Sequence, residues 1–191
     1  MIKDLMLKNR SYRRYDEGFR IGNETLVSLV ELARFCPSAA NLQPLKFLLC
    51  ASVEKNRLIF NTLSWAGYLT EWPGPSEGER PSAYIVLLGD TSINRNFYCD
   101  AGIACQSILL GAVELGLGGC ILGSVDREGL RRSFSIPVEY EILYVIALGK
   151  PAERILLEDI AEDGNIKYWR DDKGAHHVPK RLTDELIFKN I

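Results

Sequence analysis

Residues 96–117, NFYCDAGIACQSILLGAVELGL, decide the fold of this chain because they form its longest helical pattern and leave almost no polar face. A helix that is apolar almost all round is buried on all sides. Small residues recur along it and would let another backbone come close: Gly102, Ala104, Ser107 and Gly111. The pattern therefore predicts either the central helix of the core or part of a large subunit interface, and both alternatives stay open.

Shorter patterns flank this helix on both sides. Continuous apolar runs of strand length, which suit strands covered on both faces, lie at residues 47–51, 83–88 and 141–149. Helical patterns cover residues 24–36, 53–63 and 127–134. This order of elements predicts an α/β or α+β layer structure with one sheet.

The composition is that of an ordinary soluble protein with one domain. The chain has 191 residues, 47% of them hydrophobic, and a net charge of −2, so it lacks the basic excess that binding to a phosphate backbone requires. No apolar run approaches the ~20 residues of a membrane span, and no signal peptide is visible. We therefore expect a cytoplasmic protein that has neither nucleic acid nor a membrane as its partner.

The cysteines and histidines give no sign of a metal site. Five cysteines are scattered without a Cys-x-x-Cys pair, and no histidine lies at zinc-finger distance from them. Because disulfides are rare in the cytosol, we expect reduced and mostly buried thiols. His176 and His177 lie beside a turn with no third partner in view, so we expect them to be structural or solvent-facing.

The loop Pro37-Ser38-Ala39-Ala40-Asn41-Leu42-Gln43-Pro44 cannot be explained as scaffolding. Its two prolines fix the backbone at either end, and Pro37 must end the helical pattern before it. The small residues and two amides between the prolines leave hydrogen-bonding groups free for a polar ligand. We interpret this segment as a loop that holds a planar ligand.

A cationic cluster lies near the start of the chain. Arg10 and Arg13 are three residues apart with Ser11 between them, so two fork-shaped donors and a hydroxyl could converge on one phosphate. Taken alone, such a cluster could equally be a solvated basic turn.

Two segments are irregular in pattern. Residues 64–82 mix aromatic residues, Trp65 and Tyr68 among them, with prolines and glycines. Such a long loop is either a binding loop or lid, or a surface excursion that packs on its own aromatic residues.

Residues 152–191 are charged and weakly periodic but too apolar to be disordered. We expect this tail to pack on something, which could be a second subunit.

Five segments occur in the order that is typical of the nitroreductase family of flavin enzymes. They are Arg10-Ser11-x-Arg13, the loop 37–44, the helix 100–117, the glycine-rich segment 118–123 and Ala147-Leu148-Gly149-Lys150-Pro151. The chain resembles this family over most of residues 10–151. The segment 177–181 also resembles the tail of a bacterial and archaeal branch of the family.

The resemblance implies an α+β flavoprotein fold with a central, mostly antiparallel sheet flanked by helices. It implies one domain over residues 1–191, with a core at 1–151 and a C-terminal extension at 152–191 that wraps the partner. It also implies FMN held without a covalent bond, and an obligate homodimer with the long helix at the interface and two equivalent sites between the subunits.

The same resemblance assigns the contacts of the cofactor. Arg10, Ser11 and Arg13 would bind the ribityl-phosphate, and Lys180 or Arg181 would complete the phosphate site. Arg13 would also reach the N1/O2 side of the flavin, where a fixed positive charge raises the reduction potential. The partner's loop would bring to the flavin Pro37, Ser38, Ala39, Asn41 and Gln43. The segment against the ring, with one backbone amide facing N5, would be Ile121, Leu122 and Gly123.

The implied function is an FMN-dependent oxidoreductase that takes hydride from NADH or NADPH and reduces nitroaromatic, quinone or enone acceptors by a ping-pong mechanism. No catalytic side chain is expected, because hydride transfer to N5 needs no acid or base. Trp65 and Tyr68 are candidates for the substrate pocket. Two alternatives stay open: a flavin-binding redox module without turnover, and a specialised flavin reaction such as reductive dehalogenation.

Overall fold

The computed structural model describes residues 1–189, so positions 190 and 191 of the predicted extension lie outside the described residues. The chain divides into two compact units. The larger unit comprises Met1–Trp65 and Pro73–Ala152, and the smaller comprises Ala66–Trp72 and Glu153–Ile191. No helix within the described part of the chain has the length and apolar character needed to cross a membrane.

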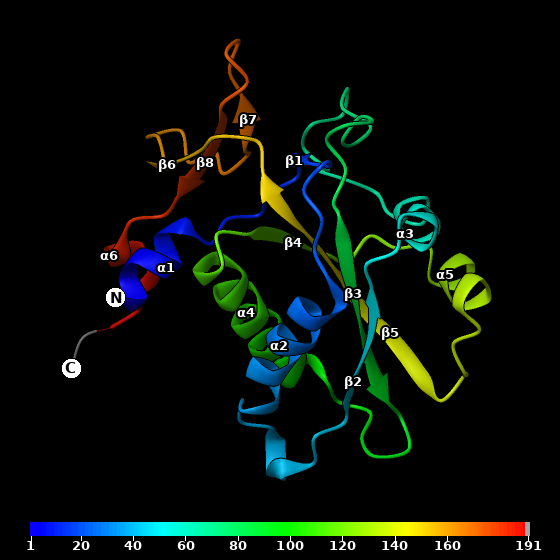
Figure 1. The fold of residues 1–191 in the computed structure, drawn as a ribbon. Helices are drawn as coiled ribbons and strands as arrows, with labels where there is room; N and C mark the ends of the chain where they lie inside the picture. Colours follow the sequence, from blue (N-terminus) through cyan, green and yellow to red (C-terminus); the bar gives the residue numbers. More distant parts are fainter. Residues whose placement is uncertain (190–191) are drawn as a thin grey trace. The chain divides into compact units, whose positions relative to one another are not determined.

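A five-stranded sheet forms the centre of the larger unit (Figure 1). Its strands are β1 (Tyr15–Asp16), β2 (Leu45–Cys50), β3 (Ala83–Asp90), β4 (Gly118–Leu122) and β5 (Tyr140–Pro151). The strand order is β1-β5-β3-β2, and β4 also pairs with β5. Every one of these pairings is antiparallel. The predicted α+β fold with a mostly antiparallel sheet is confirmed.

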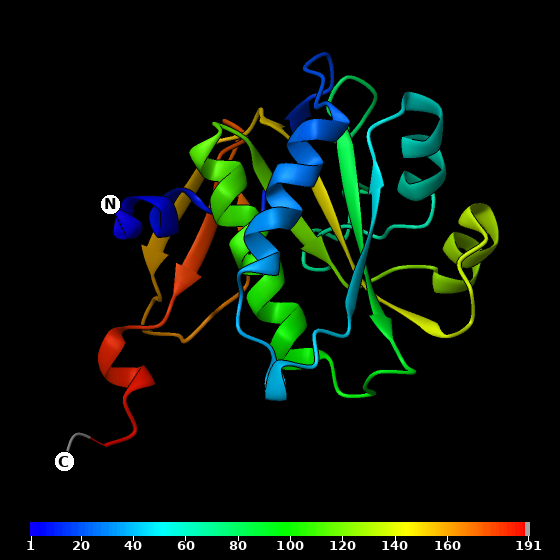
Figure 2. The ribbon, with the colours of Figure 1, turned by 60° about the horizontal axis from the view of Figure 1, so that its bottom comes forward.

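Helices cover this sheet. They are α1 (Ile2–Lys8), α2 (Asn23–Arg34), α3 (Val53–Phe60), α4 (Tyr98–Glu114) and α5 (Arg127–Phe134). Helices α2 and α4 lie side by side across one face of the sheet, and α3 and α5 lie apart from them (Figures 1 and 2). Every residue of β3 is buried, as expected for a strand that is covered on both faces.

The long helix is buried along only one side within this chain. Ala101, Cys105 and Ile108 on α4 are fully buried in the core cluster that also contains Leu26 and Leu29 of α2. At its two ends, however, Tyr98 is 69% and Leu115 is 55% exposed. The expectation that the helix is buried on all sides is therefore not met within a single chain. Its outer side is only partly covered, by α1, from whose end Asn9 donates to Gln106 at 3.3 Å.

Helix α2 ends at Arg34, two residues earlier than the predicted end. The N–H groups of Phe35 and Cys36 donate to the carbonyls of Leu32 and Ala33, three residues back. A tightened last turn of this kind is common at the ends of helices. The chain has thus left the α-helix before it reaches Pro37, because the residue that precedes a proline disfavours helical angles.

The smaller unit forms a sheet of its own instead of a weakly structured tail. Strand β8 (His176–Lys180) pairs in parallel with β6 (Ile155–Asp159) and antiparallel with β7 (Trp169–Arg170), and a short helix α6 (Thr183–Leu186) follows. Part of the irregular segment 64–82 belongs to this unit. The Arg170 guanidinium lies 4.2 Å from the centre of the Trp72 ring, and the rings of Tyr68 and Tyr168 are 4.9 Å apart.

Candidate functional site

The loop between Pro37 and Pro44 has an unusual backbone. A single 3₁₀ turn at Ala39–Asn41 is its only regular element. Ala40, Asn41 and Gln43 have φ angles of 50°, 56° and 51°. The left-handed region costs residues other than glycine about 1–2 kcal/mol each. Strain of this kind persists only where the surroundings enforce it, and it clusters at ligand-binding sites.

One buried carboxylate holds the loop. The Ser38 hydroxyl donates to Asp100 Oδ2 at 2.5 Å, and the Ala39 N–H donates to Asp100 Oδ1 at 3.1 Å. The Gln43 N–H donates to the Ser38 Oγ at 2.9 Å, which closes the loop. Asp100 is 4% exposed and lies in the first turn of α4. Its side chain therefore couples the loop to the core helix.

The sequence pattern places Asp100 at the start of the long helix and does not reveal this anchoring role. The sequence did contain an indirect indication, because a carboxylate at the start of an almost wholly apolar helix is expected to be buried. A buried carboxylate needs hydrogen-bond donors. The sequence does not show that those donors come from a loop 61 residues away in the chain.

A hollow of about 760 Å³, open to solvent, lies beside the loop. Apolar side chains of α2, β2 and α4 form most of its wall, among them Val30, Ala33, Leu45, Phe47 and Ala104. The predicted site residues Pro37, Ser38 and Gln43 line it together with Asp100. Ala39 and Asn41 project from the same turn and are exposed.

The N-terminal cationic segment lies against β4. Ser11 forms a parallel β-bridge with Gly119, and the Tyr12 N–H donates to the Gly119 carbonyl at 3.0 Å. This close approach requires glycine in β4. A Cβ at Gly118 would lie 2.4 Å from Tyr12 Cδ2. Gly119 is required by the neighbouring strand instead, because a Cβ there would lie 2.6 Å from the Ala147 carbonyl oxygen of β5. The structure therefore brings Arg10, Ser11 and Arg13 to the strand that carries the next group of predicted residues.

One guanidinium nitrogen of this segment meets no acceptor. Arg10 Nη2 donates to the Met6 carbonyl at 2.7 Å, whereas Arg10 Nε is buried and meets no acceptor within residues 1–189. Burial lowers the pKa of Arg10, as expected when a cation is partly removed from water. Arg13 Nη1 donates to the Ser11 carbonyl at 3.2 Å. A guanidinium that is partly desolvated is stabilised when an anion binds to it.

The end of β4 presents one apolar side chain outward. Ile121 is 38% exposed, although Cys120 and Leu122 on either side of it are buried. Gly123 follows, and its carbonyl accepts a hydrogen bond from Arg127 Nη2 at 3.2 Å. In the predicted segment Ile121, Leu122 and Gly123, the Ile121 side chain is therefore exposed, and the turn at Gly123 is held by the hydrogen bond from Arg127.

The remaining predicted residues are placed as follows. Trp65 is 7% exposed, packs against Phe60 at a ring distance of 5.9 Å, and has a buried Nε1 without an acceptor in the described chain. Tyr68 belongs to the smaller unit and is 48% exposed. Lys180 ends β8 and Arg181 follows it, and both are exposed. Their roles in binding stay predictions.

The histidines and cysteines of the described residues do not form a metal site. No group of three or more metal-ligating side chains comes together within residues 1–189, and the five cysteines, all of which lie in that range, form no disulfide. His177 stacks on Trp169 at 4.0 Å and lies between Glu158 and Asp171, with its Nε2 3.3 Å from Asp171 Oδ2. These two carboxylates raise the pKa of His177.

Comparison with known proteins identifies relatives of this arrangement. The model of the nitroreductase family matches residues 6–73 and 76–150. A protein of Methanothermobacter thermautotrophicus named "Putative NADH dehydrogenase/NAD(P)H nitroreductase" is 30% identical over 172 residues, which cover 86% of this chain and 85% of that protein.

Solved structures share the fold. An FMN-dependent nitroreductase of Clostridium difficile R20291 superposes with a TM-score of 0.68 at 22% identity, over 100% of this chain and 99% of that one. A protein of Exiguobacterium sibiricum, solved in complex with FMN, superposes with a TM-score of 0.66 at 18% identity, over 80% of this chain and 89% of that one.

Proposed function

The chain belongs to the nitroreductase family, and from this premise we propose that it is an FMN-dependent oxidoreductase. It takes hydride from NADH or NADPH and passes electrons to a nitroaromatic, quinone or enone acceptor in a ping-pong sequence. The observation that carries the proposal is the pairing of the segment around Ser11 with β4. This pairing sets two arginines beside the strand end that exposes Ile121.

The residues present fit FMN in three respects. Arg10 has a buried Nε without an acceptor in the described chain, which a phosphate oxygen would supply. Ser11 is exposed beside it and offers a hydroxyl. Ile121 offers an apolar surface for a ring. Arg10, Ser11 and Arg13 would therefore hold the phosphate, and Lys180 or Arg181 of the tail would add a further cation.

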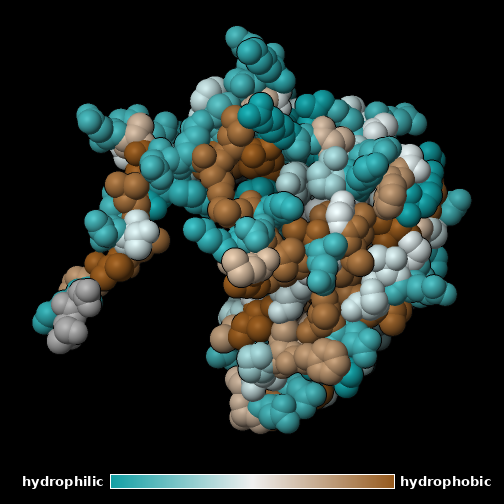
Figure 3. Space-filling model, turned by 60° about the vertical axis from the view of Figure 1, so that its left-hand side comes forward, coloured by the Kyte–Doolittle hydropathy of each residue, from teal (hydrophilic) through white to brown (hydrophobic). Residues whose placement is uncertain are grey.

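We further propose that the site is completed in a homodimer. Figure 3 shows hydrophobic residues gathered on the face that lies to the left in Figure 1. Large apolar side chains on α2 and α4, at the C-caps of these helices and in the loop 37–44 are 39% to 69% exposed, namely Val27, Leu32, Phe35, Leu42, Tyr98 and Leu115. Exposed apolar surface on this scale favours a protein interface. The loop 37–44 of one subunit would then contact the flavin that the other subunit holds.

The chain's own residues have binding and orienting roles. When bound, FMN supplies the hydride acceptor and donor, so no side-chain acid or base is needed. Arg13 would place a fixed positive charge where the reduced flavin is anionic, which favours reduction. Ser38, Ala39 and Asn41, on a loop anchored by Asp100, would exclude water from the opposite edge of the ring. No other residue is assigned to the chemical step.

The proposal is tested with the purified protein and its visible spectrum. We expect a yellow protein that contains FMN and is bleached by NADH or NADPH in the absence of oxygen, with colour returning when a quinone or nitroaromatic compound is added. A protein that takes up no FMN would contradict the flavin assignment. A yellow protein that neither nicotinamide bleaches would instead support a flavin-binding module without turnover.

A further inference from the structure

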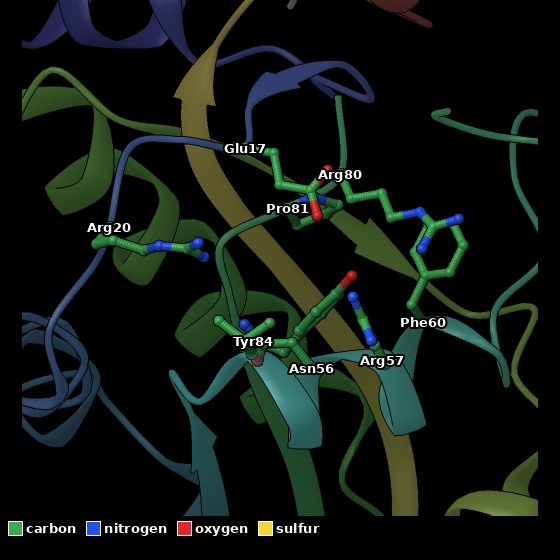
Figure 4. Close-up of a pocket in the computed structure, with 9 residues that line it drawn as sticks. Glu17, Arg20, Asn56, Arg57, Phe60, Arg80, Pro81 and Tyr84 are labelled. Atoms are coloured by element: carbon green, nitrogen blue, oxygen red, sulfur yellow. The ribbon is translucent and has the colours of Figure 1, made fainter. Parts of the chain in front are cut away.

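A second cluster of arginines lies in the larger unit and plays no part in the site described above. It lines a hollow of about 310 Å³ that is open to solvent. Arg20 comes from the loop after β1, Arg57 from α3 and Arg80 from the loop before β3. Figure 4 shows the three side chains around one space, with Arg20 on the side opposite to Arg57 and Arg80.

The positive charges of this pocket exceed the negative charges of its lining residues. Glu17 is the one carboxylate among its lining residues, and the Gly78 N–H already donates to it. None of the three arginines forms an ion pair in the part of the chain that the structure describes. Arg80 lies over the Phe60 ring at 4.5 Å, and its Nε is buried without an acceptor among residues 1–189. The pocket thus combines a net positive charge with donors that lack an acceptor.

Two polar groups in the wall make no hydrogen bond with the described residues, and one of them is a fully buried atom. Tyr84 is 1% exposed, and its hydroxyl forms no hydrogen bond within the described residues. Burial raises the pKa of Tyr84, so the hydroxyl stays protonated and can donate. Asn56, 7% exposed, donates from Nδ2 to the Ser82 carbonyl at 2.8 Å, whereas its Oδ1 meets no donor there. A buried polar group without a partner is costly, and a ligand that supplies one recovers that energy.

We propose that this pocket is a second binding site, and that it takes a small phosphate monoester that also carries hydroxyl groups, such as a sugar phosphate. Arg20, Arg57 and Arg80 bind the phosphate, because fork-shaped guanidinium groups match its oxygens. The Tyr84 hydroxyl donates to the same anion. Glu17 and Asn56 Oδ1 are acceptors, so they select the hydroxyl groups of the ligand and disfavour a bare anion. The proposal does not depend on the flavin reaction.

Calorimetric titration of the FMN-saturated protein with ribose 5-phosphate tests the site, because the flavin phosphate site is then filled. We expect saturable binding, weaker binding of inorganic phosphate and none of ribose. Arg57→Gln, an exposed change on α3, should weaken the binding at least about tenfold, as expected for the loss of one charged contact. Arg132→Gln removes the same charge from exposed α5 and should have no effect.

Tyr84→Phe distinguishes a ligand contact from a structural role. Because the hydroxyl has no partner within the described residues, its removal should leave the melting temperature unchanged or raise it, while ribose 5-phosphate binds several-fold more weakly. Titration with adenosine monophosphate distinguishes a nucleotide from a free sugar phosphate as the ligand. Tighter binding than that of ribose 5-phosphate indicates a nucleotide, and weaker binding indicates a free sugar phosphate.

Three results would overturn the proposal. One is the absence of saturable binding to the wild-type protein, and another is equal binding to wild type and Arg57→Gln. Inorganic phosphate that binds as tightly as ribose 5-phosphate would refute the role given to Glu17 and Asn56. If the protein holds no FMN, the titration is made without it, and Arg13→Ala must then leave the binding unchanged. The second site can therefore fail or succeed independently of the flavin site.

Discussion

The loop 37–44 and the segment 10–13 are proposed to contact the same cofactor, but they are fixed in opposite ways. Backbone pairing with Gly119 fixes the segment, and Arg10 Nε meets no acceptor among residues 1–189. A side chain, that of Asp100, fixes the loop and engages Ser38 in doing so. The segment should therefore be sensitive to any bulk in the strand beneath it, and the loop to the loss of a single carboxylate.

The largest effect should come from added bulk under the segment. Gly119→Val would place a Cβ 2.6 Å from the Ala147 carbonyl oxygen. That oxygen belongs to the sheet and cannot move aside. We expect the free energy of unfolding to fall by about 3 kcal/mol and FMN to be lost. Denaturant unfolding measures the first effect and visible absorbance the second. Gly67→Ala, in open space, is the control and should change neither.

A smaller effect should follow when the anchor of the loop is removed. Asp100→Ala takes away the acceptor of the Ser38 hydroxyl and the Ala39 N–H, and should lower the free energy of unfolding by about 2 kcal/mol. Glu114→Ala, an exposed carboxylate on the same helix, should be nearly neutral. Equal stability of the two variants would show that the loop does not depend on Asp100.

The cations of the segment should affect binding more than stability. Arg13→Ala should weaken FMN affinity by about 1.5 kcal/mol, roughly tenfold in Kd, because one charged hydrogen bond is lost. Fluorescence titration of the apoprotein with FMN measures the change. Arg132→Ala carries the same change of charge on α5 and should bind FMN as the wild type does. Unchanged affinity of Arg13→Ala would place the phosphate elsewhere.

The smallest effect concerns the smaller unit, where β8 carries Lys180. Glu158 and Asp171 raise the pKa of His177 in the folded chain above its unfolded value of about 6.5. The stabilisation is therefore fully present below about pH 6.5 and is lost as the pH rises through the folded pKa. The melting temperature should fall as the pH rises above about 6.5, and His177→Gln should remove part of that fall. The same pH dependence in both proteins would contradict this role.

Local patterns were enough to predict most of the longer elements of the larger unit. The apolar run at 83–88 became β3, the helical pattern at 127–134 became α5, and the residues around Pro37 ended α2. These features depend on side chains close in sequence. The contiguous cluster at Arg10 and Arg13 was found for the same reason, although its function is still a prediction.

Features that need distant parts of the chain were not predicted. The pocket of Arg20, Arg57 and Arg80 is assembled from three elements, so no window of sequence contains it. Asp100 meets its loop only because α4 packs against α2. The sheet of the smaller unit joins Ile155 to His176 in parallel, a pairing that the charged composition of the tail conceals.

Strand β5 has a consequence for how the protein is made. It is the last strand of the larger unit along the chain, yet it pairs with β1, β3 and β4. Until the ribosome has delivered residues 140–151, those three strands lack this neighbour, and the apolar β3 has only β2 beside it. Unpaired strand edges and exposed apolar surface in a growing chain favour aggregation. The nascent protein should therefore depend on chaperones until the very end of this strand has been synthesised.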